Sequence, residues 1–532
     1  MGMELRSNGT NFMKEISKWY DTLLPRLVPY LYVNGGPIIA VQVENEAGGS
    51  PPCDEAHFDY LEKLRDIYVK HLGEDVVYLT VDGDRAKLAQ CGNVKGLYST
   101  LNFGATGSAA KKFAVQRVAD PRGPYVCSAF FSGWLDHWGF PFNKVSTETL
   151  VAGLKDVLEF SNKSASVSMY MFHGGTNFAW GQGARSDFDK KMNNSYTRLW
   201  GKMTSYDYDA PLSEAGDTTP KYMAIRELLS NYNTVKPVPS NTTKHRWGPV
   251  EMKLSFDIFH LVDEAKVIPG TFVKSKFPLP MEEMGQYHGP VAYQVRIPDS
   301  ISLPAEIDVP LYGDRIYLIT VNKNNWVKVQ VNSRNRPSKR FKTFQRKLLF
   351  LVDENGHSNS NNVRYANSMY QKGIISNVTA NGYILENWSA TLIGKLLIPD
   401  GPFAGPITQN IRSLKMGKSS PKIKYSGDFM PSWYVGEVRN LYKVNADTFI
   451  DTQGWGKGII WLYSLDTPNY NAYNLGRYWP LAGPQMRNFC PGPWLSNTGE
   501  INMFEFEKAP TGNLITLEET PLVDGPSDSS QI

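Results

Sequence analysis

The 532-residue chain has few cysteines, little net charge and no long apolar run. Its four cysteines are too few for a disulfide scaffold and too scattered for a zinc site, and no His-Glu-x-x-His occurs. A net charge of +4 over this length argues against a role on nucleic acid or a membrane surface. No apolar run approaches the roughly 18 residues of a spanning helix. We therefore expect no metal, no nucleic-acid partner and no membrane span.

Two further absences narrow the class of protein. No Gly-x-Ser-x-Gly occurs, so a serine hydrolase is unsupported. The first 14 residues are polar and lack an apolar centre, so no signal peptide is visible. Six glycosylation sequons favour a secretory route only mildly, because such triplets arise by chance: Asn8, Asn162, Asn193, Asn241, Asn377 and Asn387.

The composition is that of an ordinary globular protein. Hydrophobic residues make up 41% of the chain and charged residues 20%. The length exceeds what one core can bury, so two to four domains are expected. Aromatic residues reach 12%, with 13 tryptophans. That richness suits either a carbohydrate-handling protein or large β-domain cores.

Residues 1–232 alternate apolar strands with amphipathic helices, which predicts parallel β/α units. The expected strands fall near 35–46, 76–81, 96–103, 124–130 and 167–172. Helical spacing of apolar residues appears over 12–27, 58–72, 150–160 and 222–232.

The pattern changes after residue 232. Residues 233–250 are rich in proline, which predicts a linker. Residues 251–392 and 393–518 show short alternating runs separated by Gly, Asn and Pro, which predicts two β-sandwich domains. Residues 519–532 are rich in Ser, Asp and Gly and are expected to be a disordered tail.

The stretch 35–46 carries the clearest chemical signal. A Gly-Gly-Pro turn opens an apolar strand that closes abruptly in Glu44-Asn45-Glu46. A buried parallel strand has this form when its carboxyl end carries chemistry. We expect Glu46 to be a general acid/base, with Glu44 on the same strand face, two residues back.

Together, residues 35–46 and 128–139 resemble the two active-site signatures of the glycoside hydrolase family 35 β-galactosidases. The resemblance covers Leu5 to about Pro510 and is closest to the animal lysosomal enzymes. It implies a (β/α)₈ TIM barrel followed by two galactose-binding-like jelly rolls. It also implies retaining hydrolysis of terminal β-linked galactose from glycan partners, with no cofactor, and a lysosomal or secreted location. A homo-oligomer is left open.

The resemblance also assigns individual residues. Glu46 matches the proton donor, and Asn45 a residue that binds the sugar 2-hydroxyl. In the second signature the family has Ser-Glu-Phe with a nucleophilic glutamate, but here that position is Ala129. The remaining matches are two pocket tyrosines, a tryptophan at the pocket wall and a disulfide pair: Tyr170, Tyr208, Trp134, and Cys53 with Cys91.

Ala129 has a direct chemical consequence. A methyl group cannot attack an anomeric carbon, so the covalent route is closed unless another carboxylate such as Asp136 replaces the missing one. We also expect the first three β/α units of the barrel to be absent from this chain. Three functions stay open: a working exo-β-galactosidase in which Ala129 is an error or compensated, a non-hydrolysing β-galactoside binder, and a shortened or disabled form of an active enzyme.

Overall fold

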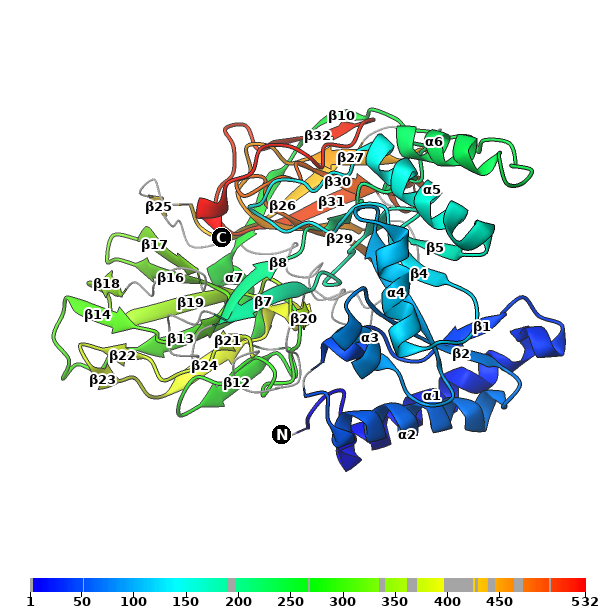
Figure 1. Cartoon of the computed structure of the whole chain (residues 1–532). Coiled ribbons are helices and arrows are strands. Elements are labelled where there is room, and N and C mark those ends of the chain that lie inside the picture. Colours follow the sequence, from blue (N-terminus) through cyan, green and yellow to red (C-terminus); the bar gives the residue numbers. More distant parts are fainter. Residues whose placement is uncertain are drawn as a thin grey trace.

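The protein is described from a computed structural model of the whole chain, in which one α/β region adjoins two β-rich regions (Figure 1). The structure describes residues 3–50, 52–188, 197–266, 268–333, 340–360, 371–396, 424–425, 429–438, 445–463, 472–496 and 499–532. The sequon at Asn193 lies outside these ranges. None of the helices described there combines the length and apolarity that a bilayer crossing requires.

The N-terminal region contains one parallel sheet, whose five strands pair in sequence order. The strands are β1 (Ala40–Gln42), β2 (Val77–Gly83), β3 (Tyr98–Gly104), β4 (Val126–Phe131) and β5 (Ser166–Tyr170). All five were predicted, although β1 is shorter than expected. The chain leaves β geometry after Gln42, and Glu44 and Glu46 both have positive φ, at 62° and 52°. The two glutamates therefore do not share one face of a strand.

Four of the N-terminal helices match predicted ones and two were missed (Figure 1). The predicted helices are α1 (Thr10–Leu23), α2 (Glu55–Leu72), α5 (Thr147–Lys163) and α6 (Pro220–Leu229). The missed ones are α3 (Ala86–Gly92) and α4 (Ala109–Ala119). The buried face of α4 includes Lys112 and Gln116, which hides the apolar period from sequence analysis.

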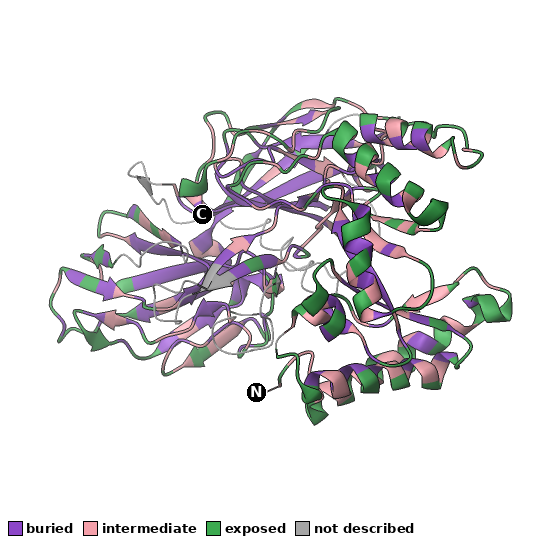
Figure 2. Ribbon diagram, in the orientation of Figure 1, coloured by how far each residue is buried: buried purple, intermediate pink, exposed green. Residues whose placement is uncertain are grey.

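The first all-β domain packs a seven-stranded sheet against a four-stranded one, and side chains of both sheets meet in one core. Its strands, in chain order, are β12 (Phe272–Ser275), β13 (Val291–Arg296), β14 (Ala305–Asp308), β16 (Arg315–Val321), β17 (Trp326–Ser333), β18 (Phe341–Thr343), β19 (Lys347–Asp353), β22 (Thr379–Ala380), β23 (Tyr383–Ile384), β24 (Trp388–Thr391) and β25 (Lys424–Tyr425). The central strands β13, β16 and β19 are buried along almost their whole length, whereas β23 is exposed (Figure 2).

The second all-β domain has a five-stranded and a four-stranded sheet around its own core. Its strands are β10 (Gly248–Glu251), β11 (Lys253–Asp257), β26 (Ser432–Glu437), β27 (Thr448–Asp451), β28 (Gly458–Tyr463), β29 (Ala472–Tyr478), β30 (Arg487–Cys490), β31 (Glu500–Glu505) and β32 (Leu514–Glu518). The predicted boundary at residue 251 does not follow this pairing. β10 and β11 pair with β32 and β26, so the segment assigned to the linker and first β domain belongs to the second.

A shared apolar core joins the two all-β domains. The helix α7 (Ile258–Ala265) contributes Leu261 and Val262, which pack with Tyr317 of the first domain and Trp461 of the second. All four side chains are fully buried. Burial of this kind stabilises a fixed arrangement of the two domains, since separating them would expose the aromatic rings to water.

The C-terminal residues differ from the predicted disordered tail. Gly525 and Asp528 donate backbone hydrogen bonds to the carbonyls of Pro484 and Ala482, at 2.9 and 2.8 Å. The side chain of Ile532 packs with Trp138 of the α/β region. The composition of this segment is typical of disorder. Backbone hydrogen bonds to a turn of the second all-β domain nevertheless hold it in place.

Candidate active site

The candidate proton donor Glu46 lies at the carboxyl edge of the parallel sheet. Its backbone N–H donates to the carbonyl of Val81 at 2.8 Å, which fixes it beside the end of β2. The side-chain amide of Asn102, near the end of β3, donates to Glu46 Oε1. Sequence analysis missed Asn102, although a polar residue at the end of a predicted strand was an available signal.

Ala129 lies on the strand next to Asn102. It occupies β4 as the register partner of Asn102 on β3, and its side chain is half-buried. The structure therefore brings the two predicted catalytic positions, Glu46 and Ala129, to one edge of the sheet, separated by Asn102. A methyl group therefore occupies the position to which the resemblance assigns the nucleophile.

Glu44 does not act on Glu46 as a strand neighbour. Its carboxylate accepts hydrogen bonds from Arg6 Nε and the Tyr60 hydroxyl, both at 2.8 Å, and from the backbone N–H of Asn45 at 2.6 Å. Burial would raise the pKa of Glu44, but the hydrogen bond and charge of Arg6 outweigh it and hold the pKa below its ordinary value. Glu44 thus anchors the turn that carries Asn45 and Glu46.

Asn45 itself is exposed, and its side-chain oxygen accepts from Gln42 Nε2 at 3.0 Å. The contact is local, within the same turn. It leaves the Asn45 side chain at the surface beside Glu46, where the resemblance places a sugar-binding amide.

Three tyrosines and a tryptophan form an aromatic wall beyond the end of β4, the strand that carries Ala129. The ring of Tyr208 lies 5.6 Å from Tyr170, 5.4 Å from Tyr206 and 6.2 Å from Trp134. Trp134 also contacts Phe131, the last residue of β4. The predicted Tyr170, Tyr208 and Trp134 are thus brought together, and Tyr206 is an additional member that the sequence analysis did not single out.

Tyr208 is buried and electrostatically linked to the candidate acid. Its pKa lies above the ordinary value because of burial, and then because of the nearby Tyr170 and Glu46 groups. Its backbone is left-handed, with φ of 64°. A Cβ on Gly133 would lie 1.8 Å from the Tyr208 carbonyl oxygen, so only glycine lets the loop after β4 lie against this residue.

Asp136, the nearest alternative carboxylate in sequence, is held elsewhere. It is buried, and its Oδ1 accepts from the backbone N–H of Asn143 at 2.7 Å and from the Asn143 side chain at 2.9 Å. Burial raises the pKa of Asp136 to about 7, and the charges of Asp207 and Asp209 add to the effect. A buried, hydrogen-bonded carboxyl of this kind is poorly suited to attack a sugar.

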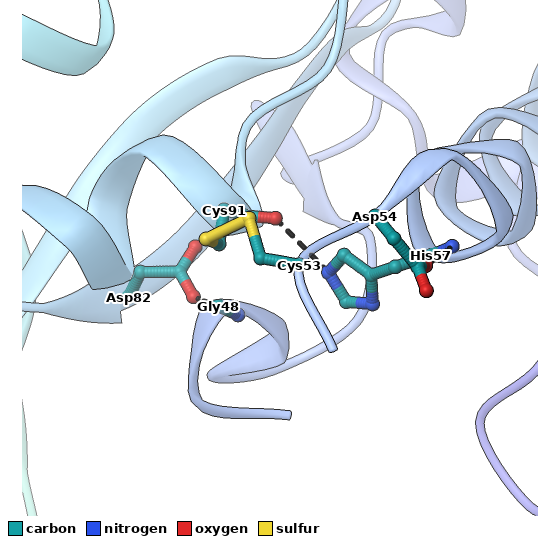
Figure 3. The surroundings of a disulfide bond; sticks show 6 residues. All are labelled: Gly48, Cys53, Asp54, His57, Asp82 and Cys91. Atoms are coloured by element: carbon teal, nitrogen blue, oxygen red, sulfur yellow. Dashed lines mark hydrogen bonds between the residues drawn. A yellow bond between two sulfur atoms is a disulfide. The ribbon is translucent and has the colours of Figure 1, made fainter. Parts of the chain in front are cut away.

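A disulfide lies close to Asp82 and Gly48, the latter two residues after Glu46 (Figure 3). It joins Cys53 and Cys91, the pair that the resemblance implies, across a sequence separation of 38 residues. Asp82 lies beside it and accepts from the backbone N–H of Gly48 at 2.8 Å. The carbonyl of Cys91 is bonded to the His57 ring at 3.0 Å. The disulfide and Asp82 together fix the segment just after Glu46.

Replacing both Cys53 and Cys91 with serine is expected to lower the free energy of unfolding of the α/β region by about 3–4 kcal/mol, because the loop they close becomes free in the unfolded chain. Thermal unfolding followed by tryptophan fluorescence measures the effect. The single Cys53→Ser variant should show the same loss as the double variant. A melting temperature of the unsubstituted protein that does not change with reductant would contradict the expectation.

A retaining glycosidase needs two carboxyl groups, and of the two positions that the resemblance assigns only Glu46 carries one. The Glu46 carboxyl is a group that could protonate a leaving oxygen, and tyrosine and tryptophan side chains are groups that could offer apolar rings and hydroxyls to a sugar. Ala129 cannot form a glycosyl ester. Within the described part of the chain, no three His, Cys, Asp or Glu side chains are grouped so that they could hold a metal ion.

The comparison with known families agrees with this class of site. Residues 1–232 match the family described as glycosyl hydrolases family 35. Residues 278–394 match the first all-beta domain of beta-galactosidase, and residues 431–500 its galactose-binding domain.

Individual relatives extend the match over the whole chain. The beta-galactosidase of Canis lupus familiaris is 37% identical over 96% of this chain and 72% of its own. That of Homo sapiens is 35% identical over 95% of this chain and 71% of its own. The beta-galactosidase-1-like protein of Mus musculus is 31% identical over 98% of this chain and 75% of its own. The chain belongs to glycoside hydrolase family 35.

Proposed function

We propose that this protein binds terminal β-galactosides at the carboxyl edge of its parallel sheet, and that its hydrolysis of them is strongly impaired. The observation that carries the proposal is the arrangement of Glu46, Asn102 and Ala129 on neighbouring strand ends. The acid/base position is occupied and held by a hydrogen bond, whereas the nucleophile position carries a methyl group. Asn45, Tyr170, Tyr208 and Trp134 are the proposed sugar contacts.

The fold supports the proposal at the level of architecture. We infer that β1 to β5 correspond to the last five β/α units of a (β/α)₈ barrel, because the strands are parallel, pair in sequence order and alternate with helices. We infer that both all-β domains are jelly rolls. The Cys53–Cys91 disulfide favours an oxidising compartment, which supports a lysosomal or secreted location.

A non-catalytic galactoside-binding protein is the second candidate, and Ala129 is the observation that favours it. Both candidates share the binding step, so binding alone does not separate them. They differ in whether Glu46 still protonates a leaving group when an external nucleophile replaces the missing side chain.

The separating experiment measures turnover of an aryl β-galactoside with and without sodium azide. Without azide we expect a rate about 10⁵-fold below that of an intact relative such as the canine enzyme, a loss of ~7 kcal/mol of barrier lowering. With azide, the anion attacks the anomeric carbon from the face of Ala129 while the aryl oxygen departs with a proton from Glu46. The bond to azide forms as the glycosidic bond breaks, so the product is the α-galactosyl azide.

The product identifies the outcome. Formation of α-galactosyl azide, lost on Glu46→Gln, supports an impaired hydrolase with a working acid. Binding without any azide product favours the non-catalytic reading. Fast azide-independent hydrolysis would show that another carboxylate has replaced the missing one, and the proposal of impairment would fail.

A further inference from the structure

The aromatic wall is carried by a segment that the second all-β domain holds in place. This segment, residues 203–209, includes β9 (Ser205–Tyr206), which pairs with β6 (Gly175–Thr176) of the α/β region. It supplies both Tyr206 and Tyr208. The segment is deeply buried at its start, since Met203, Thr204 and Ser205 are at most 2% exposed. Its position therefore depends on whatever packs against its buried side.

Two polar groups of the second all-β domain bind that buried side. The side-chain oxygen of Gln485 accepts from the backbone N–H of Ser205 at 2.9 Å, in a fully buried contact. The backbone carbonyl of Arg477 accepts from the Thr204 hydroxyl at 2.7 Å, also buried. An unmet buried N–H costs about 1–3 kcal/mol, so the Gln485 contact is a strong constraint on where Ser205 lies.

The approach of the two regions is close enough to require a glycine. Gly476 of β29 has φ of +95°, and a Cβ there would lie 2.6 Å from Thr204 Cγ2. The next residue, Arg477, is fixed by the first all-β domain, because its guanidinium binds Asp353 at 2.7 Å and Glu354 at 3.0 Å with all three groups buried. The support for the segment is thus itself rigid.

Ser205 is held from its other side by the α/β region. Its hydroxyl donates to Glu214 Oε2 at 2.7 Å, and the Thr176 hydroxyl donates to Glu214 Oε1 at 2.6 Å. Ser205 therefore donates one hydrogen bond to each region, from its N–H to Gln485 and from its hydroxyl to Glu214. The hydroxyl of the adjacent Tyr206 lies 3.3 Å from the hydroxyl of Tyr170. A shift of Ser205 would therefore move Tyr206 and change its contact with the rest of the aromatic wall.

We propose that Gln485 is a positioning residue for the β-galactoside site. Gln485 does not touch the sugar in this arrangement; it holds the Ser205 N–H so that Tyr206 and Tyr208 face Glu46 and Ala129. The second all-β domain thereby contributes to sugar affinity through the α/β region. This inference rests on the proposed function, because it requires the aromatic wall to contact a galactoside.

The test compares variants of the full chain for affinity toward isopropyl β-thiogalactoside, a galactoside without a cleavable oxygen bond, by titration calorimetry. Gln485→Leu keeps a similar volume but removes the acceptor, and we expect at least ~10-fold weaker binding. The matched control is Gln453→Leu, an exposed glutamine of the same domain that bonds only to Asp451, and its affinity should be unchanged.

A conservative variant separates positioning from general damage. In Gln485→Glu at pH 5, a protonated buried carboxyl can still accept from Ser205 and donate to the Arg487 carbonyl, as the Nε2 of Gln485 does. We expect this variant to bind within ~3-fold of the unsubstituted protein at that pH, a difference below about 1 kcal/mol.

A second measurement uses the unsubstituted protein and covers the case in which Gln485→Leu does not fold. Because the coupling is reciprocal, the thiogalactoside should slow hydrogen exchange in residues 474–487, which lie away from the sugar. Equal affinity of folded Gln485→Leu, or unchanged exchange over 474–487 when ligand is bound, would overturn the inference. No binding by the unsubstituted protein would instead overturn the proposed function.

Discussion

Replacing Ala129 with glutamate is expected to raise hydrolysis of an aryl β-galactoside by at least ~10³-fold, or roughly 4 kcal/mol of barrier. The register places Ala129 directly across from Asn102, whose amide holds Glu46. Glu46 is held beside β2 and residue 129 lies on β4, two strand spacings or about 10 Å away, so glutamate side chains extended from both positions can approach the ~5–5.5 Å separation of the carboxyl pair in retaining glycosidases. The product should keep the β configuration.

Two variants control this experiment. Ala129→Gln adds the same bulk without a nucleophile and should stay as slow as the unsubstituted protein. Adding Glu46→Gln to Ala129→Glu should remove most of the gain for substrates whose leaving group needs a proton, because general acid catalysis contributes about 10²–10⁴-fold. If Ala129→Glu is no faster than Ala129→Gln while both bind the thiogalactoside, the nucleophile position has been assigned wrongly.

Stability is expected to fall as pH rises from 5 to 8. Burial raises the pKa of Asp82 and Asp136 to about 7 and that of Glu214 and Glu505 to about 8, and all four carboxyls are at most 5% exposed. Such groups keep their proton in the folded state but lose it near pH 4 in the unfolded state. Their contribution is therefore complete below about pH 4 and is lost as pH rises through 7 to 8.

The size of the effect follows from linkage. Each such group makes the free energy of unfolding fall by about 1.4 kcal/mol per pH unit between its unfolded and folded pKa values. Added over the four groups, these slopes give a loss on the order of 10 kcal/mol between pH 5 and 8. The melting temperature, measured by scanning fluorimetry at pH 5, 6.5 and 8, should decrease steadily. A flat or rising profile over this range would contradict the expectation.

One substitution isolates a single contributor. The Glu214 carboxyl accepts hydrogen bonds from the hydroxyls of Thr176 and Ser205, both of which can rotate to suit an amide. Glu214→Gln should therefore flatten the pH profile and raise the melting temperature at pH 8 relative to the unsubstituted protein. Glu227→Gln, at an exposed position of α6, should leave the profile unchanged.

Local sequence patterns predicted the elements that depend on local periodicity. The five parallel strands and four of the six N-terminal helices follow from apolar spacing, because each pattern repeats within ten or so residues. The roles of Glu46 and Ala129 came from the resemblance to family 35 and stay predictions, and the structure places both positions at the carboxyl edge of the sheet. The missed helix α4 shows the limit: Lys112 and Gln116 are buried by contacts that its own sequence does not reveal.

Sequence patterns were enough to predict a β/α region, two β-rich domains and membership of family 35, with an alanine at the position where the resemblance expects a second carboxylate. Tertiary structure alone decided that Asn102 holds Glu46, that Glu44 pairs with Arg6, and that β10 and β11 belong to the second all-β domain. It also decided that Gln485 reaches Ser205 across 280 residues. These contacts join residues far apart in the chain, and a hydrogen bond of that kind leaves no periodic trace in either local segment.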